Sequence, residues 1–103
     1  MQNKVKEFNS NMPCHRKRMP VHARIMDIQS ELGELSKEVL KNSRYGTDEF
    51  VMKNSFKMEF GDVLYSMLSL ACEENILADE CLDMVLKKYE ERIRKNNSMG
   101  SGK

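Results

Sequence analysis

Residues 21–40 read VHARIMDIQSELGELSKEVL, and this stretch decides the fold. Its apolar side chains recur in alternating steps of four and three, at Val21, Ile25, Ile28, Leu32, Leu35 and Val39. An α-helix has 3.6 residues per turn, so this spacing lines the side chains up on one face. Pro20 suits the first turn of such a helix, and Asn42 and Gly46 signal its end. The stretch therefore predicts a helix of about five turns with one core-facing stripe.

The rest of the chain also favours helices over strands. Its 103 residues include only five glycines and two prolines. Three more helices are expected, over 2–10, from a cap at Thr47 or Asp48 to about Asn75, and over 78–95. A basic, proline-containing connector occupies residues 11–20. We expect a single domain over residues 1–97, followed by a disordered tail, 98–103.

The third predicted helix is apolar on nearly all sides. Its broad apolar face comprises Phe56, Phe60, Val63, Leu64, Met67, Leu68, Leu70 and Ala71, with Met58, Tyr65 and Cys72 opposite. The last helix should turn inward Leu82, Val85, Leu86, Tyr89 and Ile93. A helix that is apolar all round is buried all round, and a chain this short makes only a small core. We therefore expect an all-α antiparallel bundle of about four helices, completed by homo-oligomerisation.

Charge and cysteine usage narrow the class of protein. The 17 basic and 16 acidic residues leave a net charge of +1, which gives no electrostatic case for nucleic-acid or membrane binding. No apolar stretch approaches the roughly 20 residues of a membrane span. The three cysteines, Cys14, Cys72 and Cys81, are odd in number and lack the spacing of a metal site. A reduced, cytoplasmic protein is the expectation.

Acidic residues form a stripe beside the apolar one. At 100° per residue, four of them fall within about 60° of one another: Asp27, Glu31, Glu34 and Glu38. The segment EFGD adds Glu59 and Asp62 on the third helix. Two such helices packed antiparallel would bring both acidic edges together. A solvated face would explain Glu31 and Glu34, but the third helix has little solvated surface to offer.

Gathered carboxylates need a counter-charge. Two of them about 5 Å apart repel by about 3 kcal/mol at an effective dielectric near 20. Oxygen ligands without His or Cys neighbours suit Mg²⁺ or Mn²⁺, and protein-bound Mg²⁺ often binds substrate phosphates. Lys88 and Arg92, four residues apart, share a helix face and could hold phosphate, with Lys87, Arg94 and Lys95 as nearby alternatives. Such cations also complement the dipole at a helix C-terminus.

These motifs together resemble a known family. ELGE, 24 intervening residues and then EFGDVLYSMLSLA resemble the E-x-x-E and E-x-x-D signature of the MazG-like nucleotide pyrophosphohydrolases. The resemblance runs from about Met19 to Ile93 and includes LKKYEERI. It implies an all-α homodimer or homotetramer that uses Mg²⁺ to hydrolyse a nucleoside triphosphate to its monophosphate and pyrophosphate.

The resemblance also implies roles for single residues. It makes metal ligands of Glu31, Glu34, Glu59 and Asp62, and phosphate-binding residues of Lys88 and Arg92. Glu38 would ligate a second metal, orient water, or serve only as a surface residue. The base and the sugar of the substrate stay open. The alternative function is a non-catalytic helical module that binds nucleotides or another protein, which in the second case leaves the carboxylates without a task.

Overall fold

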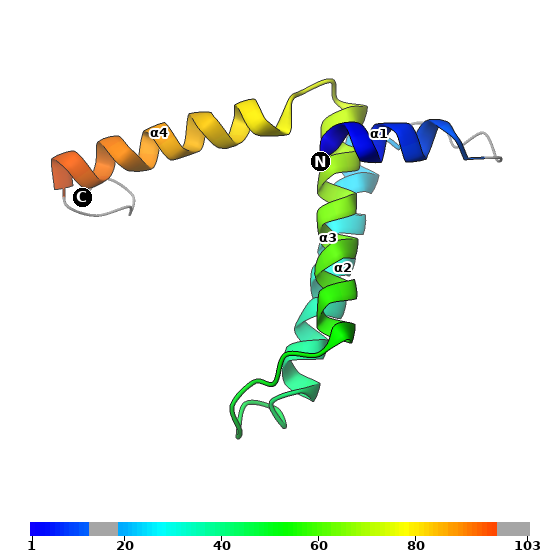
Figure 1. Cartoon of the computed structure of the whole chain (residues 1–103), viewed down its shortest axis with the longest axis vertical. Helices are drawn as coiled ribbons and strands as arrows, with labels where there is room; N and C mark the ends of the chain where they lie inside the picture. The colour runs from blue at the N-terminus through cyan, green and yellow to red at the C-terminus, as the bar shows by residue number, and fades with distance from the viewer. Residues whose placement is uncertain (13–18, 97–103) are drawn as a thin grey trace.

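A computed structural model describes residues 1–12 and 19–96, and all regular structure in them is helical. The helices are α1 (Gln2–Ser10), α2 (Val21–Lys41), α3 (Asn54–Glu73) and α4 (Ala78–Asn96) (Figure 1). The all-α prediction is confirmed, and α1, α2 and α4 have the predicted extents to within one residue. Pro20 precedes α2 as its N-cap. The predicted tail, and residues 13–18 of the basic connector, lie outside the described residues.

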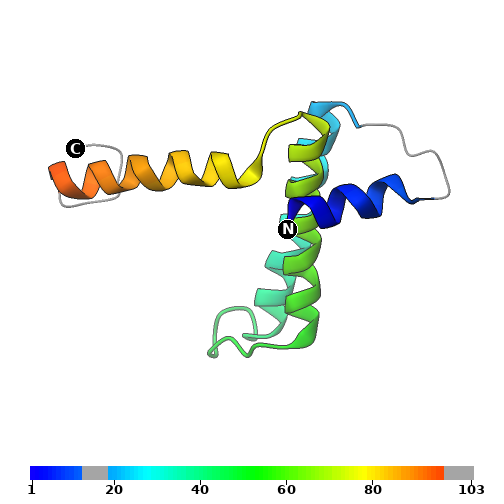
Figure 2. The ribbon, with the colours of Figure 1, turned by 45° about the horizontal axis from the view of Figure 1, so that its top comes forward.

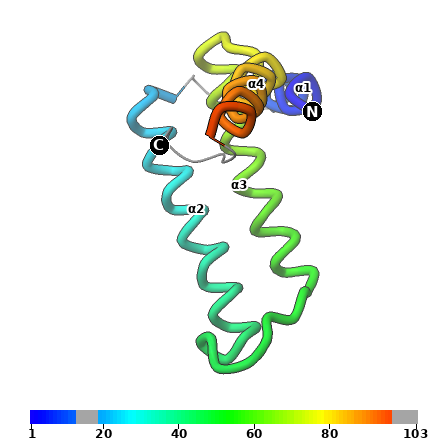
Figure 3. The backbone as a smooth tube through the Cα atoms, turned by 90° about the vertical axis from the view of Figure 1, so that its left-hand side faces the viewer, coloured from blue at the N-terminus to red at the C-terminus, as the bar shows by residue number. Residues whose placement is uncertain are grey.

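The helices α2 and α3 form an antiparallel hairpin, which is the body of the molecule (Figure 3). Ile28 of α2 and Leu68 and Ala71 of α3 are its buried hydrophobic side chains, within the described ranges. The predicted stripe on α2 is therefore only partly covered: Val21, Ile25, Leu32 and Val39 each stay about 40–50% exposed. The prediction that this stripe faces the core is therefore confirmed for Ile28 and wrong, within the single chain, for those four residues.

The start of α3 was predicted wrongly. The helix begins at Asn54 rather than after Thr47 or Asp48, because residues 42–53 form a wide turn. Arg44, Tyr45 and Gly46 have positive φ angles of 48°, 57° and 84°, and the amide of Asp48 donates to the Ser43 carbonyl at 2.9 Å. Thr47 Oγ1 donates back to the Arg44 carbonyl at 2.7 Å instead of capping a helix. Thr47 and Asp48 therefore form hydrogen bonds within this turn and do not cap α3.

A buried ionic network holds the hairpin together. The guanidinium of Arg24 on α2 donates to both carboxylate oxygens of Glu73 on α3, at 3.0 and 2.6 Å. A third nitrogen of Arg24 donates to Asp27 Oδ2 at 3.0 Å. The Ser66 hydroxyl of α3 donates to that same oxygen at 2.9 Å. The Arg24 side chain is only 2% exposed, so water does not stabilise its positive charge, and the carboxylates of Glu73 and Asp27 must do so.

The short helix α1 lies across the C-terminal end of α3. Its Asn9 donates to the Ser69 hydroxyl at 3.3 Å and accepts from the Tyr65 hydroxyl at 2.5 Å. Its Gln2 side chain spans the turn between α3 and α4: Nε2 donates to the Ile76 carbonyl at 2.8 Å, and Oε1 accepts from the Ala78 amide at 2.7 Å. The α1 helix therefore fixes how α4 leaves the hairpin.

The last helix leaves the hairpin on the side opposite to α1 (Figures 1 and 2). Among the described residues, it has no packing against another helix comparable to that of α1 on α3. The predicted inward face of α4 is consequently open, with Leu82 and Leu86 more than half exposed. The radius of gyration is 17.2 Å, against about 13 Å for a compact chain of this length. The bundle is not closed within one chain.

None of the described helices combines the length and apolarity needed to cross a membrane.

We predict that Arg24→Ala lowers the free energy of unfolding by about 3–5 kcal/mol, because it leaves the largely buried Glu73 carboxylate, 12% exposed, without its partner. Urea unfolding followed by circular dichroism measures the change. The control is Arg24→Met combined with Glu73→Leu, which removes both charges and should recover most of the loss. An equally large loss in the double variant would show that packing, not the unpaired charge, is responsible.

Candidate metal centre

Three carboxylates converge between the two helices of the hairpin. One oxygen each from Glu31 of α2 and from Glu59 and Asp62 of α3 lie within 4.8 Å of one another. Glu31 and Glu59 are half-buried, and Asp62 is exposed. We call these three residues the carboxylate cluster. The antiparallel packing thus brings together the two acidic edges that the sequence predicted would meet.

Helical periodicity explains why these side chains face each other. Glu31 follows the buried Ile28 by three residues and so shares the face of α2 that packs on α3. Glu59 and Asp62 are likewise three residues apart, and Ser66, one turn beyond Asp62, contacts Asp27 of α2. Each acidic residue thus occupies the edge of a packed face rather than the solvent side of its helix.

Mutual repulsion and burial perturb the cluster. Partial burial raises the pKa of Glu31, and the neighbouring charges of Asp62, Asp27, Glu59 and Glu34 raise it further. Partial burial also raises the pKa of Glu59, with Asp62, Glu34 and Glu38 adding to it. Both groups hold their protons more tightly than an isolated glutamate, first because partial burial disfavours the charged carboxylate, and then because ionisation adds charge to an already negative site.

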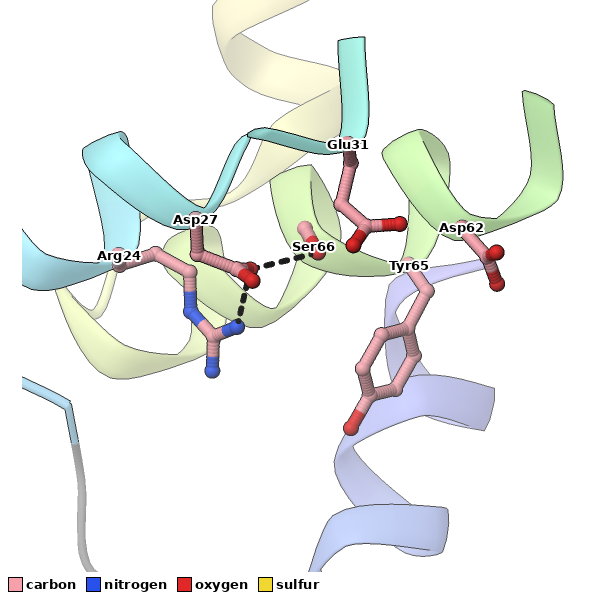
Figure 4. Close-up of a pocket in the computed structure, with 6 residues that line it drawn as sticks. All are labelled: Arg24, Asp27, Glu31, Asp62, Tyr65 and Ser66. Carbon is pink, nitrogen blue, oxygen red and sulfur yellow. Dashed lines mark hydrogen bonds and ion pairs between the residues drawn. The ribbon is translucent and has the colours of Figure 1, made fainter. Parts of the chain in front are cut away.

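An open pocket of about 240 Å³ lies beside the cluster (Figure 4). It is lined by Arg24, Asp27, Glu31, Asp62, Tyr65 and Ser66. In Figure 4 the carboxylates of Glu31 and Asp62 lie on one side of this pocket, and Asp27 is turned toward Arg24 and Ser66 on the other. The pocket therefore has an anionic wall next to a buried cation.

Glu34, the fourth predicted ligand, and Glu38, whose role the sequence leaves open, lie at the border of the cluster. Glu34 is outside the group of three, and its side chain is 51% exposed with Lys37 Nζ 3.7 Å away. Glu38 is bound locally: hydrogen bonding from Ser55, helped by the charge of Lys41 and a bond from Asn42, lowers its pKa. Glu34 is therefore the more available of the two carboxylates.

The predicted phosphate-binding pair is not beside the cluster of its own chain. Lys88 and Arg92 lie on α4, which projects away from the hairpin (Figure 1). Both flank the ring of Tyr89, with Lys88 Nζ at 5.2 Å and Arg92 Cζ at 6.0 Å from its centroid. The structure thus keeps the pair together on one helix but does not bring it to the carboxylates.

Sequence reasoning missed the part of the pocket that Arg24, Tyr65 and Ser66 contribute. The sequence pattern places Tyr65 opposite the broad apolar face of its helix, and it predicts no role for Arg24 or Ser66. A signal for Arg24 did exist, because it lies on the wheel between the acidic stripe and the apolar stripe. A cation at that boundary can reach both a carboxylate and the packed interface.

The oxygen donors of the cluster are of the kind that a small divalent cation prefers. Mg²⁺ holds oxygen ligands at about 2.0–2.1 Å in octahedral geometry, so adjacent ligand oxygens lie about 3 Å apart and opposite ones about 4 Å. The three oxygens of the cluster lie within 4.8 Å of one another, so the side chains would have to close in around an ion. All three donors are carboxylate oxygens, without nitrogen or sulfur, which favours Mg²⁺ or Mn²⁺ over Zn²⁺. Glu31, Glu59 and Asp62 are the residues that would hold the ion.

Comparison with known proteins identifies no relative of this chain. No protein-family model matches the chain, and searches of curated proteins and of solved structures also give no match.

The raised pKa values give a testable pH dependence. A carboxyl group that binds its proton more tightly when folded favours folding at low pH, and stability falls as pH rises through its folded pKa. We therefore expect Glu31→Gln and Glu59→Gln each to raise the melting temperature at about pH 7.5 without divalent ions, and to lose that advantage near pH 4.

Glu38→Gln is the matched control, and its sign should be opposite. Its lowered pKa means that the ionised carboxylate stabilises the fold above the ordinary pKa of a glutamate. The amide should therefore lower the melting temperature at about pH 7.5. Equal shifts in all three variants would mean that the cluster carries no special repulsion.

Proposed function

We propose that this chain is a Mg²⁺-dependent nucleoside triphosphate pyrophosphohydrolase of the MazG-like type. It would convert a (d)NTP to the monophosphate and pyrophosphate, with Mn²⁺ able to replace Mg²⁺. It would work as a homo-oligomer, because its apolar helix faces are open in the single chain. The free thiols of Cys72 and Cys81 support a reducing, cytoplasmic compartment.

The convergence of Glu31, Glu59 and Asp62 carries this proposal. Three carboxylates within 4.8 Å, two of them half-buried, raise the energy of the folded chain unless a cation joins them. A protein-interaction module would have no use for that repulsion. The residues are also those that the E-x-x-E and E-x-x-D resemblance assigns to metal binding, except that Glu34 lies just outside the group.

When bound, Mg²⁺ would neutralise the triphosphate and polarise its phosphorus. The chain's own residues supply the rest. Glu31, Glu59 and Asp62 would hold this cation, and Glu34, which is exposed and lies 3.7 Å from Lys37 Nζ, would accept the proton of the attacking water. Attack at the α-phosphorus expels pyrophosphate.

Lys88 and Arg92 would hold the phosphate oxygens. Within the described chain neither side chain forms an ion pair, and each lies only against the Tyr89 ring. Lys88 is exposed and Arg92 is partly exposed, and cations without carboxylate partners are free to bind an anion. Because α4 projects away from the hairpin, these two cations would reach a carboxylate cluster only if α4 changed its position or if the cluster belonged to another copy of the chain.

The test measures pyrophosphate release across a panel of NTPs and dNTPs with and without Mg²⁺. The variant Glu59→Gln, Asp62→Asn should lower metal-dependent release at least about 100-fold, since it removes two of the three ligands. Mn²⁺ or Mg²⁺ should raise the melting temperature of the wild type and not of this variant.

A second E-x-x-D in the chain provides the matched control. Glu80 and Asp83 lie on α4 with the same spacing and are exposed. Glu80→Gln combined with Asp83→Asn should leave both release and metal stabilisation near wild type. Tight triphosphate binding without release would favour a nucleotide-binding module, and neither binding, release nor a metal effect would favour a protein-interaction module.

A further inference from the structure

The sequence of α1 gives this helix little stability of its own. It has nine residues, and its N-cap, Met1, makes no side-chain hydrogen bond to it. Its first turn carries no acidic residue and its last turn no basic one, so no charge complements the helix dipole. Isolated helices shorter than about 12–15 residues are marginal in water. The segment is therefore helical because it is docked on α3.

The C-terminal end of α1 is docked beside the carboxylate pocket. Asn9 accepts a hydrogen bond from the Tyr65 hydroxyl at 2.5 Å and donates one to the buried Ser69 hydroxyl at 3.3 Å. The Phe8 ring meets the Tyr65 ring edge-on, with centroids 6.1 Å apart. Tyr65 lines the pocket, and Figure 4 shows its hydroxyl directed away from the carboxylates. The α1 helix therefore holds this part of the pocket wall from behind.

The N-terminal end of α1 is docked on the turn that leads to α4. The Gln2 side chain donates to the Ile76 carbonyl at 2.8 Å and accepts from the Ala78 amide at 2.7 Å. That amide belongs to the first turn of α4, where amides have no partner within their own helix. The Gln2 carbonyl also accepts a weak hydrogen bond from the Cys72 thiol, with sulfur and oxygen 3.9 Å apart. Contacts with Gln2 thus hold the turn from which α4 projects.

The two docked ends depend on each other because one short helix joins them. If the contacts at one end are lost, the remaining contacts must hold a segment that is not a stable helix by itself. Such a segment opens as one cooperative unit. None of its residues is buried, so opening exposes little apolar surface and leaves the hairpin with its Arg24 network. The opening of α1 is therefore easier than the unfolding of the hairpin.

We propose that α1 is a detachable brace, which docks and opens as one unit and so couples the wall of the carboxylate pocket to the direction of α4. When α1 opens, Tyr65 loses its contacts with Asn9 and Phe8, and the turn before α4 loses Gln2 in the same event. By linkage, anything that turns α4 or displaces the Tyr65 ring also shifts the docking of α1. The coupling does not depend on the proposed function.

The Cys72 thiol reports on the brace from the turn end. With Cys14→Ser and Cys81→Ser, the half-buried Cys72 is the one thiol of the chain. Asn9→Ala removes two hydrogen bonds at the other end of α1, about 10 Å along the helix from Gln2. It should raise the rate at which Cys72 reacts with a thiol reagent about tenfold, because α1 opens more often. An unchanged rate would mean that the two ends are held independently, which overturns the proposal.

Asn11→Ala is the matched control for Asn9→Ala. Asn11 follows the same end of α1 and is exposed, and its side chain has no hydrogen bond to another described residue. The reaction rate of Cys72 should stay near that of the parent chain. An equal acceleration would show that the contacts of Asn9 have no special role, and this too would overturn the proposal.

Hydrogen exchange separates opening of the brace from unfolding of the whole chain. In Asn9→Ala, the amides of α1 and of residues 75–78 should lose protection together, whereas those of α2 and of the first half of α3 should keep theirs. Loss of protection throughout the hairpin would mean that α1 is not a separate unit. The proposal would then be wrong.

The coupling must also act from the turn to the pocket. Gln2→Ala removes the side-chain contacts with the turn, so it should free the Tyr65 ring at the other end of α1. Fluorine NMR of 3-fluorotyrosine, in a chain with Tyr45→Phe and Tyr89→Phe, should show a shifted and broadened Tyr65 resonance. Gln29→Ala, at an exposed position of α2, is the matched control and should leave the resonance unchanged. A resonance that does not respond to Gln2→Ala would contradict the coupling.

Spin labels measure the direction of α4. Labels at Lys57→Cys of α3 and Asp83→Cys of α4 occupy exposed positions, and the native cysteines are replaced by serine. The parent chain should give one narrow distribution of label distances, and Gln2→Ala should give a broad one because the turn is no longer held. Equally narrow distributions in both chains would show that α1 does not hold α4, and would overturn the proposal.

Discussion

The buried guanidinium of Arg24 is the interaction on which the hairpin depends. It binds Glu73 through two hydrogen bonds and Asp27 through a third, so one side chain joins the first turn of α2 to the last turn of α3. A charge taken out of water tolerates only an arrangement that keeps every partner, whereas an apolar contact tolerates sliding. The network thus fixes the register of the two helices. That register in turn sets Glu31 opposite Glu59 and Asp62.

The small apolar core explains why a polar network has this role. Ile28, Leu68 and Ala71 are the buried hydrophobic residues of the described chain, and large faces on α2, α3 and α4 stay open. Burial at about 25 cal/mol per Å² stabilises a fold only when enough area is removed from water. The fold therefore combines a specific ionic contact between α2 and α3 with large apolar faces that the single chain leaves exposed.

The carboxylate cluster opposes folding rather than stabilising it. The raised pKa values of Glu31 and Glu59 show that the fold holds negative charge where burial and repulsion disfavour it. Glu38, one turn from Glu34, has the reverse environment and a lowered pKa, because Ser55 donates a hydrogen bond to it. Two residues of the same acidic stripe on α2 therefore differ in their environment. The contacts with α3 disfavour the ionised form of Glu31 and favour that of Glu38.

The sequence by itself determined the helices and the two acidic edges, because periodicity is local: spacings of three and four place side chains on one face whatever the chain packs against. It did not determine the turn before α3, where Arg44, Tyr45 and Gly46 have positive φ angles. The expected capping residues, Thr47 and Asp48, belong to that turn and not to the helix. Only the tertiary structure decided that Arg24 joins the site, that Glu34 stays outside the cluster, and that α4 points away. These outcomes depend on distances between residues far apart in the chain, such as Arg24 and Glu73 or Gln2 and Ala78. No local pattern encodes such distances.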